Sequence, residues 1–575
     1  MADNRGSSRR SSRRGPQRPK TPQRNVTGNS KSKPTSSRNR NRSTPRGRPV
    51  IVPQSRVTSL PSDLWTLLLP FLTWRDTDAM LCVCCEWRKV VSEAKKSFPE
   101  WRSTVLGPSA NGSESLELLR ANHLKWADTR FAPDLVLLSA ASQDCSPWHS
   151  GGYWEEAIAA IEGAKLLPPR CKIVGLFTMN SVLGRPEEDE DVEEDPTGSS
   201  AVTLSISIAH LPETTLEMAE FDRKDLRRYH HELENPFTSL EERDTPSFLM
   251  FGVNDQSARH LVPAVEQWHP GAAVVGAVSP LVDRCVPLAT YSGGVEARKP
   301  RKNRGAKQQA ARRPRPPGQV AFSSTILLRL QGTVGVKAFS SSGYHPITPV
   351  VRCEGASALD NFSQVMAYDL VSIVGQDEVE QHHIVDLLEP TERLAIDQED
   401  QTLNIFSCRE IAPLRHLSNC CRATESDFVP VATSADIERL EFVTPWWNNL
   451  VMSVPGLYWQ EGTYGILASH HPTRTSQALT NVLQSTQAGL SSASERALGA
   501  FLVAGALNEV EDAVHAKDVS KLVVDTFRGL QIGGCIVRIS VGPVALPGGL
   551  QLPVGRNVAQ VQAHTTCGAI FYTKA

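Results

Sequence analysis

Apolar residues recur at helical spacing between residues 59 and 102. A first stripe has the i, i+4, i+7 spacing of one helix face: Leu64, Leu68 and Phe71. A second stripe continues at similar spacing and predicts a second amphipathic helix: Met80, Cys84, Trp87 and Val91. Thr73 and Asp76 have the spacing of a capping box, with Asp in place of Glu, and mark the start of this second helix. The pattern predicts a small helical module.

Further along the chain, the pattern predicts the same β-α-β unit twice. Strands are expected over residues 133–138 and 171–175 in the first copy, and over 246–251 and 273–276 in the second. The helical stripes between them are Trp154, Ile158 and Ile161, then Leu261, Val265 and Trp268. Each closing strand ends in a Val-Gly pair, and each copy is followed by a charged insertion and an alternating strand, over residues 202–208 and 325–330. The fold class predicted is α/β (α+β), with a duplicated unit and right-handed crossovers.

The distribution of charge adds a further region to this picture, because basic residues are concentrated at the start of the chain. The chain of 575 residues has 61 Lys+Arg and 62 Asp+Glu, but residues 1–56 hold 16 of the basic residues and one acid. The arm is therefore +15 and the remainder −16. With almost nothing apolar before Val50, we expect residues 1–56 to be a disordered basic arm. Its function stays open between an import signal, weak nucleic-acid binding and an inert solvated tail.

Two further charged runs are expected to be solvent-exposed loop insertions. Residues 187–195 hold eight acids and residues 298–315 hold nine Lys/Arg without an acid. No apolar run approaches the roughly 20 residues of a membrane span, and no apolar stretch typical of a signal peptide follows the charged start. The twelve cysteines lack the dense, even spacing of a disulfide framework. We therefore expect a cytoplasmic or nuclear protein without a membrane partner.

Residues that could carry chemistry are sparse. Cys82 and Cys85 form a Cys-x-x-Cys pair, but zinc needs four ligands and no second pair of suitable spacing lies nearby, so we interpret them as small buried hydrophobes. Motifs for dinucleotide, phosphate-loop, zinc-protease and serine-hydrolase sites are absent. Cys535 and Cys567 each sit beside glycine and stay open as exposed thiols. The expectation is a protein that is not an enzyme and needs no metal or cofactor.

Residues 58 to 92 resemble the F-box. The matching features, in chain order, are the Leu60-Pro61 start, the Leu/Phe stripe and the ending Val83-Cys84-Cys85-Glu86-Trp87. The resemblance implies an F-box-like module over residues 57–104 that binds a Skp-family adaptor. The residues it assigns to that contact are Leu60, Pro61, Leu64, Leu68, Phe71, Leu72, Cys84 and Trp87. Pro70 departs from the pattern and is expected to shorten or kink the first helix, and a helical hairpin docked on the rest of the chain is the alternative.

The larger body resembles the FIST domain. The resemblance rests on the paired units followed by residues 336–349, with Thr348 where the family often has Gly, and on weaker matches after residue 498. It implies an N-terminal FIST half over residues 130–380, with insertions at 186–199 and 296–318, and a C-terminal half over residues 381–575. It also implies a small-ligand site at the turn Gly343-Tyr344-His345-Pro346, for which a tight structural turn is the alternative.

An F-box ahead of a FIST body is similar to the F-box-only receptors of cullin-RING ubiquitin ligases that carry a FIST domain. This resemblance implies a substrate-recognition subunit of an SCF-type (Skp-cullin-F-box) ligase, whose F-box binds the adaptor and whose body recruits an unidentified protein. A second expectation is a FIST protein that senses a small, amino-acid-like ligand without a ligase role. The charge of −16 outside the arm argues against nucleic-acid binding by the body.

Overall fold

The computed structural model describes the chain from residue 64 to residue 574, with gaps. The described residues are 64, 68–123, 127, 129–142, 152–163, 167–168, 171–178, 182–184, 202–221, 233–237, 245–253, 255–279, 288–292, 320–322, 325–355, 358–359, 366–367, 370–375, 380–388, 390, 403–409, 411, 414, 441–443, 446–448, 451–453, 461–470, 472–505, 511–537, 539–543, 545, 559–563 and 565–574. The basic arm, the two charged insertions, Leu60 and Pro61 lie outside this set.

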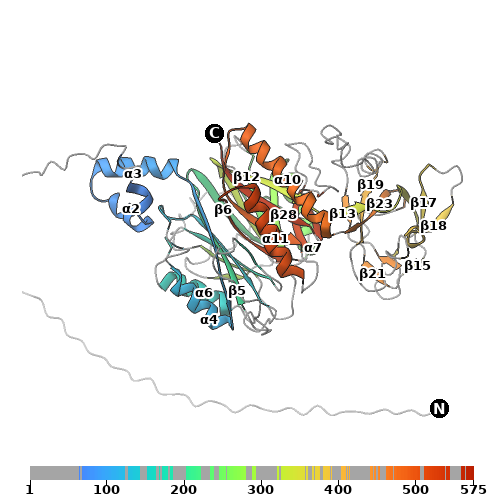
Figure 1. The fold of residues 1–575 in the computed structure, drawn as a ribbon, viewed down its shortest axis with the longest axis horizontal. Coiled ribbons are helices and arrows are strands. Elements are labelled where there is room, and N and C mark those ends of the chain that lie inside the picture. The colour runs from blue at the N-terminus through green and yellow to red at the C-terminus, as the bar shows by residue number, and fades with distance from the viewer. Residues whose placement is uncertain are drawn as a thin grey trace, which may run out of the picture. The chain divides into compact units, whose positions relative to one another are not determined.

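The helical module consists of short helices (Figure 1). A 3-10 helix, η1 (Leu69–Phe71), is followed by α2 (Trp74–Met80) and α3 (Cys85–Ser97). The capping box is confirmed, because Thr73 Oγ1 accepts from the Asp76 N–H while the Asp76 carboxylate accepts from the Thr73 N–H at 3.0 Å. The prediction of one continuous second helix was wrong. The chain turns between α2 and α3, and Cys84 is extended there (φ −156°, ψ 170°) and caps α3.

Both predicted β-α-β units are present. In the first, β2 (Leu135–Ala141) and β3 (Lys172–Thr178) are parallel and are joined through α6 (Gly152–Gly163). In the second, β7 (Ser247–Gly252) and β8 (Ala273–Val278) are parallel and are joined through α7 (Asp255–Trp268). The predicted strands that follow also form, as β5 (Val202–His210) and β11 (Thr325–Gly332). Each pairs antiparallel with the first strand of its own unit.

A third copy of the unit was not predicted. Here β24 (Arg496–Gly505) runs parallel to β25 (Gln531–Val537), with α11 (Glu511–Thr526) between them in sequence, and β28 (Thr566–Thr573) lies antiparallel beside β24. A sequence signal existed, because Val519, Val523 and Phe527 recur every four residues and are buried.

Each unit is the centre of a larger sheet. The first sheet has the order β1-β5-β2-β3-β9-β10, with β1 (Glu100–Ser109), β9 (Leu288–Ser292) and β10 (Ala321–Phe322). The second has the order β27-β26-β8-β7-β11-β6, with β27 (Ala559–Ala563), β26 (Ile539–Pro543) and β6 (Thr214–Phe221). The third has the order β12-β28-β24-β25-β4, with β12 (Val334–Ser341) and β4 (Val182–Gly184). All three therefore repeat one arrangement.

The closing strand of each unit has glycine at its fourth residue: Gly175, Gly276 and Gly534. A Cβ at Gly276 would overlap the carbonyl oxygen of Met250 on the neighbouring strand, and one at Gly534 would overlap that of Leu502. In the second and third units this glycine thus marks a place where paired backbones approach too closely for any other residue, whereas a Cβ at Gly175 would overlap the ring of Trp154 in α6.

The three sheets share one apolar core and carry helices on their other faces. In β2, Leu135 and Leu137 lie in the shared core, while Val136 and Leu138 pack with α6 and with α4 (Gly112–Ala121). This alternation follows from the two-residue period of a strand. In the same way, α7 covers the second sheet, and α11 with α10 (Pro472–Ser492) covers the third.

A fourth sheet is built from strands between residues 344 and 470, gathered together in Figure 1. Its order is β18-β17-β14-β23-β19-β20, with β13 also paired to β23. The bounds are β13 (Tyr344–Pro346), β14 (Val351–Gly355), β17 (Leu370–Ile373), β18 (Gln381–His383), β19 (Leu403–Cys408), β20 (Glu441–Val443) and β23 (Tyr464–His470). Two small hairpins accompany it: β15 (Ala358–Leu359) with β16 (Met366–Ala367), and β21 (Trp446–Asn448) with β22 (Val451–Ser453).

The sheets cross the expected domain boundaries. The fourth sheet runs through the boundary at residues 380/381, and β26 and β27, from the expected C-terminal half, complete the second sheet. β1 starts at Glu100 and pairs with β5, so residues 100–104 belong to the body rather than to the helical module. Within the described residues, no helix combines the length and apolar character needed to cross a membrane.

Candidate partner-binding surface

The helical module exposes large apolar side chains. Five such residues are exposed in the described part of the chain, and all lie between residues 64 and 98: Leu64, Leu68, Phe71, Val83 and Phe98. Phe71 is 84% exposed and Val83 61%, whereas the other three are 37–42% exposed. The first stripe of the sequence therefore faces solvent instead of the core of its own chain. We call Leu64, Leu68, Phe71 and Val83 the apolar surface of the module.

The other apolar residues of the module are buried or half-buried in a core of their own. Leu69, Met80, Val91 and Ala94 form a small core together with Phe131, which belongs to the segment leading into β2. Half-buried apolar residues complete this core: Leu72, Leu81, Trp87 and Val90. The module is thus folded against the body through Phe131, and burying its core leaves the apolar surface uncovered.

Backbone hydrogen bonds fix α2 to the body. The Trp74 N–H donates to the carbonyl oxygen of Thr129 at 2.7 Å. The buried Thr77 hydroxyl lies 2.9 Å from the carbonyl oxygens of both Trp74 and Arg130. The Trp74 bond satisfies an N–H at the start of the helix that has no partner within it. They also set the position of α2 relative to residues 129–131.

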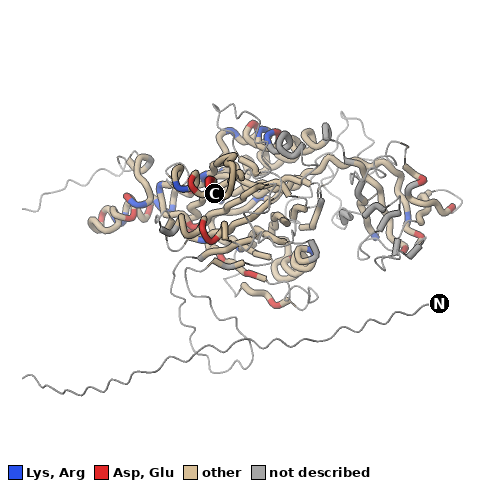
Figure 2. The backbone as a smooth tube through the Cα atoms, turned by 90° about the horizontal axis from the view of Figure 1, so that it is seen from below, with Lys and Arg blue, Asp and Glu red and all other residues tan. Residues whose placement is uncertain are grey.

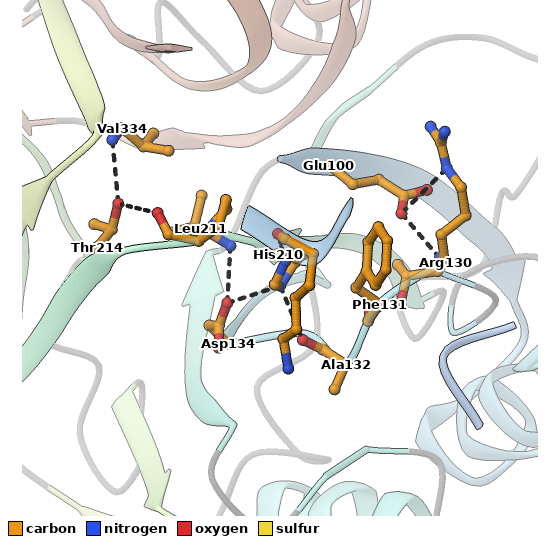
Figure 3. Close-up of polar contacts among 12 residues, drawn as sticks. Glu100, Arg130, Phe131, Ala132, Asp134, His210, Leu211, Thr214 and Val334 are labelled. Carbon is orange, nitrogen blue, oxygen red and sulfur yellow. Dashed lines mark hydrogen bonds and ion pairs between the residues drawn. The ribbon is translucent and has the colours of Figure 1, made fainter. Parts of the chain in front are cut away.

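His210 joins α3 to the body (Figure 3). This side chain is buried, with Nε2 3.0 Å from the carbonyl oxygen of Lys95 in α3. On the other side of the ring, Nδ1 lies 3.1 Å from the carbonyl oxygen of Ala132 and 3.1 Å from the Asp134 carboxylate. Asp134 in turn accepts from the Leu211 N–H at 2.8 Å. One side chain at the end of β5 therefore bridges the module and the first sheet.

Glu100 forms a second junction beside it (Figure 3). Its buried carboxylate accepts from the Arg130 N–H at 2.9 Å and from Arg102 Nε at 2.9 Å, and lies 3.7 Å from Arg130 Nε. A buried carboxylate needs such partners to offset its lost hydration. Glu100 therefore holds the start of β1 against the segment that anchors α2.

The other residues assigned to the adaptor contact have different environments. Cys84 is exposed, and its Sγ accepts from the Trp87 N–H at 3.5 Å. Trp87 and Leu72 are half-buried in the module core. The interpretation of Cys82 and Cys85 as buried hydrophobes was wrong, because both thiols are exposed. Cys82 lies in the turn between α2 and α3, and Cys85 is the first residue of α3.

The predicted ligand turn, residues 343–346, is mostly strand. Tyr344, His345 and Pro346 form the short strand β13, which pairs antiparallel with β23. Gly343 and Tyr344 are buried, whereas His345 and Pro346 are half-buried. Tyr344 is only 1% exposed, so its ring is not presented to solvent, and the ligand site at these four residues stays a prediction. Strand pairing accounts for this placement, because it aligns Tyr344 with His470 of β23.

The thiols left open as exposed are buried. Burial raises the pKa of Cys535 to about 12 and the pKa of Cys567 to about 11. The Cys567 Sγ lies 3.1 Å from the Ser340 hydroxyl and 3.2 Å from the Ser540 hydroxyl. Both thiols are therefore protonated at neutral pH and shielded from solvent. Within the described residues, no group of three or more His, Cys, Asp or Glu side chains could hold a metal ion.

The sequence reasoning missed Val83 and His210. Val83 stood in the quoted ending but was not assigned to the contact, and no sequence signal marked it as exposed. His210 follows the alternating strand at 202–208, and no sequence pattern connects it with Lys95. No protein-family model matches the chain, and no curated protein is significantly similar to it.

Proposed function

We propose that the chain is the substrate-recognition subunit of an SCF-type ubiquitin ligase. In this proposal the apolar surface of the helical module binds a Skp-family adaptor, and the three-sheet body recruits the target protein. The observation that carries the proposal is that four of the five exposed large apolar side chains of the described residues lie between residues 64 and 83. The resemblance of that segment to the F-box supports the identity of the partner.

The energetics favour a protein partner for this surface. Burying apolar area contributes about 25 cal/mol per Å², and a large aromatic side chain buries about 150 to 250 Å². Phe71 is the largest of the side chains on this surface and the most exposed, so it has the most to gain. Anchoring through Thr77, Phe131 and His210 fixes the module before binding, which lowers the entropy lost on association.

Purified adaptor provides the direct test. The full chain should capture a Skp-family adaptor, and Leu68→Ala or Phe71→Ala should each weaken that binding by about 1 to 3 kcal/mol, measured by titration calorimetry. Phe98→Ala is the matched control, because Phe98 is also an exposed phenylalanine but lies at the end of α3. If the wild-type chain fails to bind adaptor and to capture a cullin from lysate, the proposal is wrong.

A second candidate function is sensing of a small, amino-acid-like ligand. One observation favours it: the hydroxyls of Ser341 and Ser342, directly before Gly343, are buried and have no hydrogen-bond partner within the described residues. Buried hydroxyls without partners cost about 1 to 3 kcal/mol each, so a bound ligand that satisfied them would stabilise the fold.

Thermal unfolding distinguishes this second function. A free amino acid that binds should raise the melting temperature of the full chain, and the double change Ser341→Ala with Ser342→Ala should abolish that shift. Without a ligand, the same double change should raise the melting temperature, because it removes two unsatisfied groups. Free amino acids that leave the wild-type melting temperature unchanged would count against sensing.

A further inference from the structure

A cavity of about 1160 Å³ lies where the helical module meets the body. Residues 97–104, from the end of α3 into β1, line one side of it. Residues 495–498, at the start of β24, and residues 526–531, between α11 and β25, line another. The cavity is therefore formed between the first strand of the body and one end of the third sheet.

The edge of β1 borders this cavity. Among the described strands, β1 pairs with β5 alone, so its second edge has backbone groups without strand partners. Successive side chains of a strand point to opposite faces, so a cavity against one face is lined by every second residue. Here consecutive residues line it, including Trp101, which packs in the shared core, and Arg102, which does not. The edge therefore faces the cavity.

The cavity is basic although the body is acidic. Four arginines and two glutamates line it, an excess of two positive charges: Arg102, Arg130, Arg496, Arg528, Glu100 and Glu495. Figure 2 shows both basic and acidic positions close to the C-terminal end of the chain, where Thr573 also lines the cavity.

Two of the four arginines have an acidic partner among the residues that the structure describes, and two do not. Glu100 accepts from Arg102 and lies beside Arg130, so these two guanidinium groups are partly neutralised and held in place. Arg496 and Arg528 are exposed, and no salt bridge to either forms within the described part of the chain. These two side chains remain available to an anionic partner, for which Arg is well suited because it pairs with carboxylates in a bidentate manner.

We propose that this groove binds an extended acidic peptide segment of a partner protein. The segment adds to the free edge of β1 as a strand, and its carboxylates pair with Arg496 and Arg528. Main-chain hydrogen bonds to β1 supply affinity, and the arginines select acidic side chains. This inference deepens the proposed function, on which it rests in one respect: it makes that peptide the recognition segment of the recruited target.

The dimensions favour a peptide over a small ligand. Pockets for small molecules are typically about 300 to 1,000 Å³, so this volume exceeds that range. An extended pentapeptide spans about 17 Å at about 3.4 Å per residue, which matches the five residues of β1, 100–104, that line the groove. A peptide held there would lie directly beside the end of α3, and so beside the proposed adaptor-binding module.

Fluorescence anisotropy with the full chain tests the proposal. The probe is a labelled octapeptide of alternating Glu and Val, and its counterpart has Lys in place of Glu. We expect the acidic peptide to bind in the micromolar range and the basic peptide not to bind. Arg496→Glu combined with Arg528→Glu should weaken the acidic peptide at least tenfold, whereas Arg120→Glu, an exposed arginine in the last turn of α4, should not.

A second form of the probe tests strand addition itself. N-methylation of every second amide on the edge that would face β1 removes the hydrogen-bond donors and should reduce binding at least tenfold. Methylation of the alternate set is the control and should have little effect. Equal binding of both methylated forms, competition by inorganic phosphate at the same concentrations as the acidic peptide, or no binding of the acidic peptide at all overturns the proposal.

The outcome can be separated from that of the proposed function. The double variant Arg496→Glu and Arg528→Glu leaves the apolar surface of the module intact, so it should bind adaptor like the wild-type chain. Loss of peptide binding with normal adaptor binding supports both assignments. Peptide binding by a wild-type chain that does not bind adaptor would reject the ligase role and retain the peptide groove.

Discussion

The helical module and the three-sheet body treat large apolar side chains in opposite ways. In the body, Phe251 and Phe501 contact each other within the shared core and are 1% and 2% exposed. In the module, Phe71 is 84% exposed although it belongs to a clear apolar stripe. The same periodicity therefore marks residues buried within the chain in one region and residues exposed to solvent in the other. Periodicity shows that a face is apolar, not what covers it.

The largest expected difference in the free energy of unfolding comes from replacing a phenylalanine by alanine, once in the body and once in the module. Phe501→Ala should lower the free energy of unfolding by about 3 to 5 kcal/mol, because it removes a buried ring and leaves a cavity between sheets. Phe71→Ala should change it by less than about 0.5 kcal/mol, because the ring is already solvated. Urea denaturation of the full chain followed by tryptophan fluorescence measures both. Similar losses in the two variants would show that Phe71 is packed against the chain in solution.

Glycine substitutions extend the comparison to the backbone. Gly276→Ala should lower the free energy of unfolding by about 1 to 3 kcal/mol, because the new methyl group overlaps the Met250 carbonyl and the paired strands must separate. Gly152→Ala is the matched control, because a Cβ at that position at the start of α6 meets no atom within 4 Å from elsewhere in the described residues. Alanine there should stabilise by up to about 1 kcal/mol. Equal effects of the two changes on the urea midpoint would contradict the close approach of β7 and β8.

A smaller loss of stability is expected where His210 connects the module to the body. His210→Leu should lower the free energy of unfolding by about 1 to 2 kcal/mol, because it removes the imidazole whose ring nitrogens lie 3.0 and 3.1 Å from the carbonyl oxygens of Lys95 and Ala132. Hydrogen exchange measures where the loss falls: amides of α3 should exchange faster, while those of β24 and β25 should not. Lys96→Ala is the control, because its salt bridge to Glu213 is exposed and contributes little. Equally faster exchange of the α3, β24 and β25 amides would show that His210 stabilises the whole body and not the attachment of α3.

The β-α-β units could be predicted because buried strands and helical stripes leave a local pattern. Trp154, Ile158 and Ile161 are all buried in α6, as that pattern requires. The third copy was missed because its closing strand reads as glycine-rich sequence, from Gln531 to Gly534, rather than as an apolar run. The second stripe of the module misled for a different reason. Its spacing continues across the turn before Cys84, so periodicity alone could not locate the end of α2.

The candidate sites depended on contacts that sequence spacing does not encode. Tyr344 was predicted from a motif, but its burial follows from pairing with β23, more than a hundred residues later in the chain. The same holds for the bridge from His210 to Lys95 and for the groove, which brings Arg102 together with Arg496 and Arg528. Long-range pairing of this kind is decided by the whole sheet and not by any local segment.

Thiol labelling gives the smallest perturbation and compares the two regions without mutation. At pH 8, iodoacetamide should modify Cys82, Cys84 and Cys85 in the folded chain, because all three are exposed. Cys535 and Cys567 should react only when the chain unfolds, because burial raises their pKa values and denies the reagent access. Peptide mapping by mass spectrometry, with and without urea, assigns each modified residue.

The buried thiol of Cys567 makes the stability of the chain towards urea depend on pH, and the sign of that dependence can be worked out. Burial raises the pKa of Cys567 from its ordinary value of 9.0 to about 11, so between these values the unfolded chain loses a proton that the folded chain keeps. The contribution of this thiol to stability is therefore full below about pH 9 and declines as the pH rises towards 11. Cys567→Ala removes that dependence, so its urea midpoint should fall less between pH 8.5 and about 10 than that of the wild-type chain. Cys82→Ala should leave the pH dependence unchanged, because Cys82 is exposed in the fold. Rapid labelling of Cys567 at pH 8 without urea would instead place this thiol at an accessible surface and contradict the shared core.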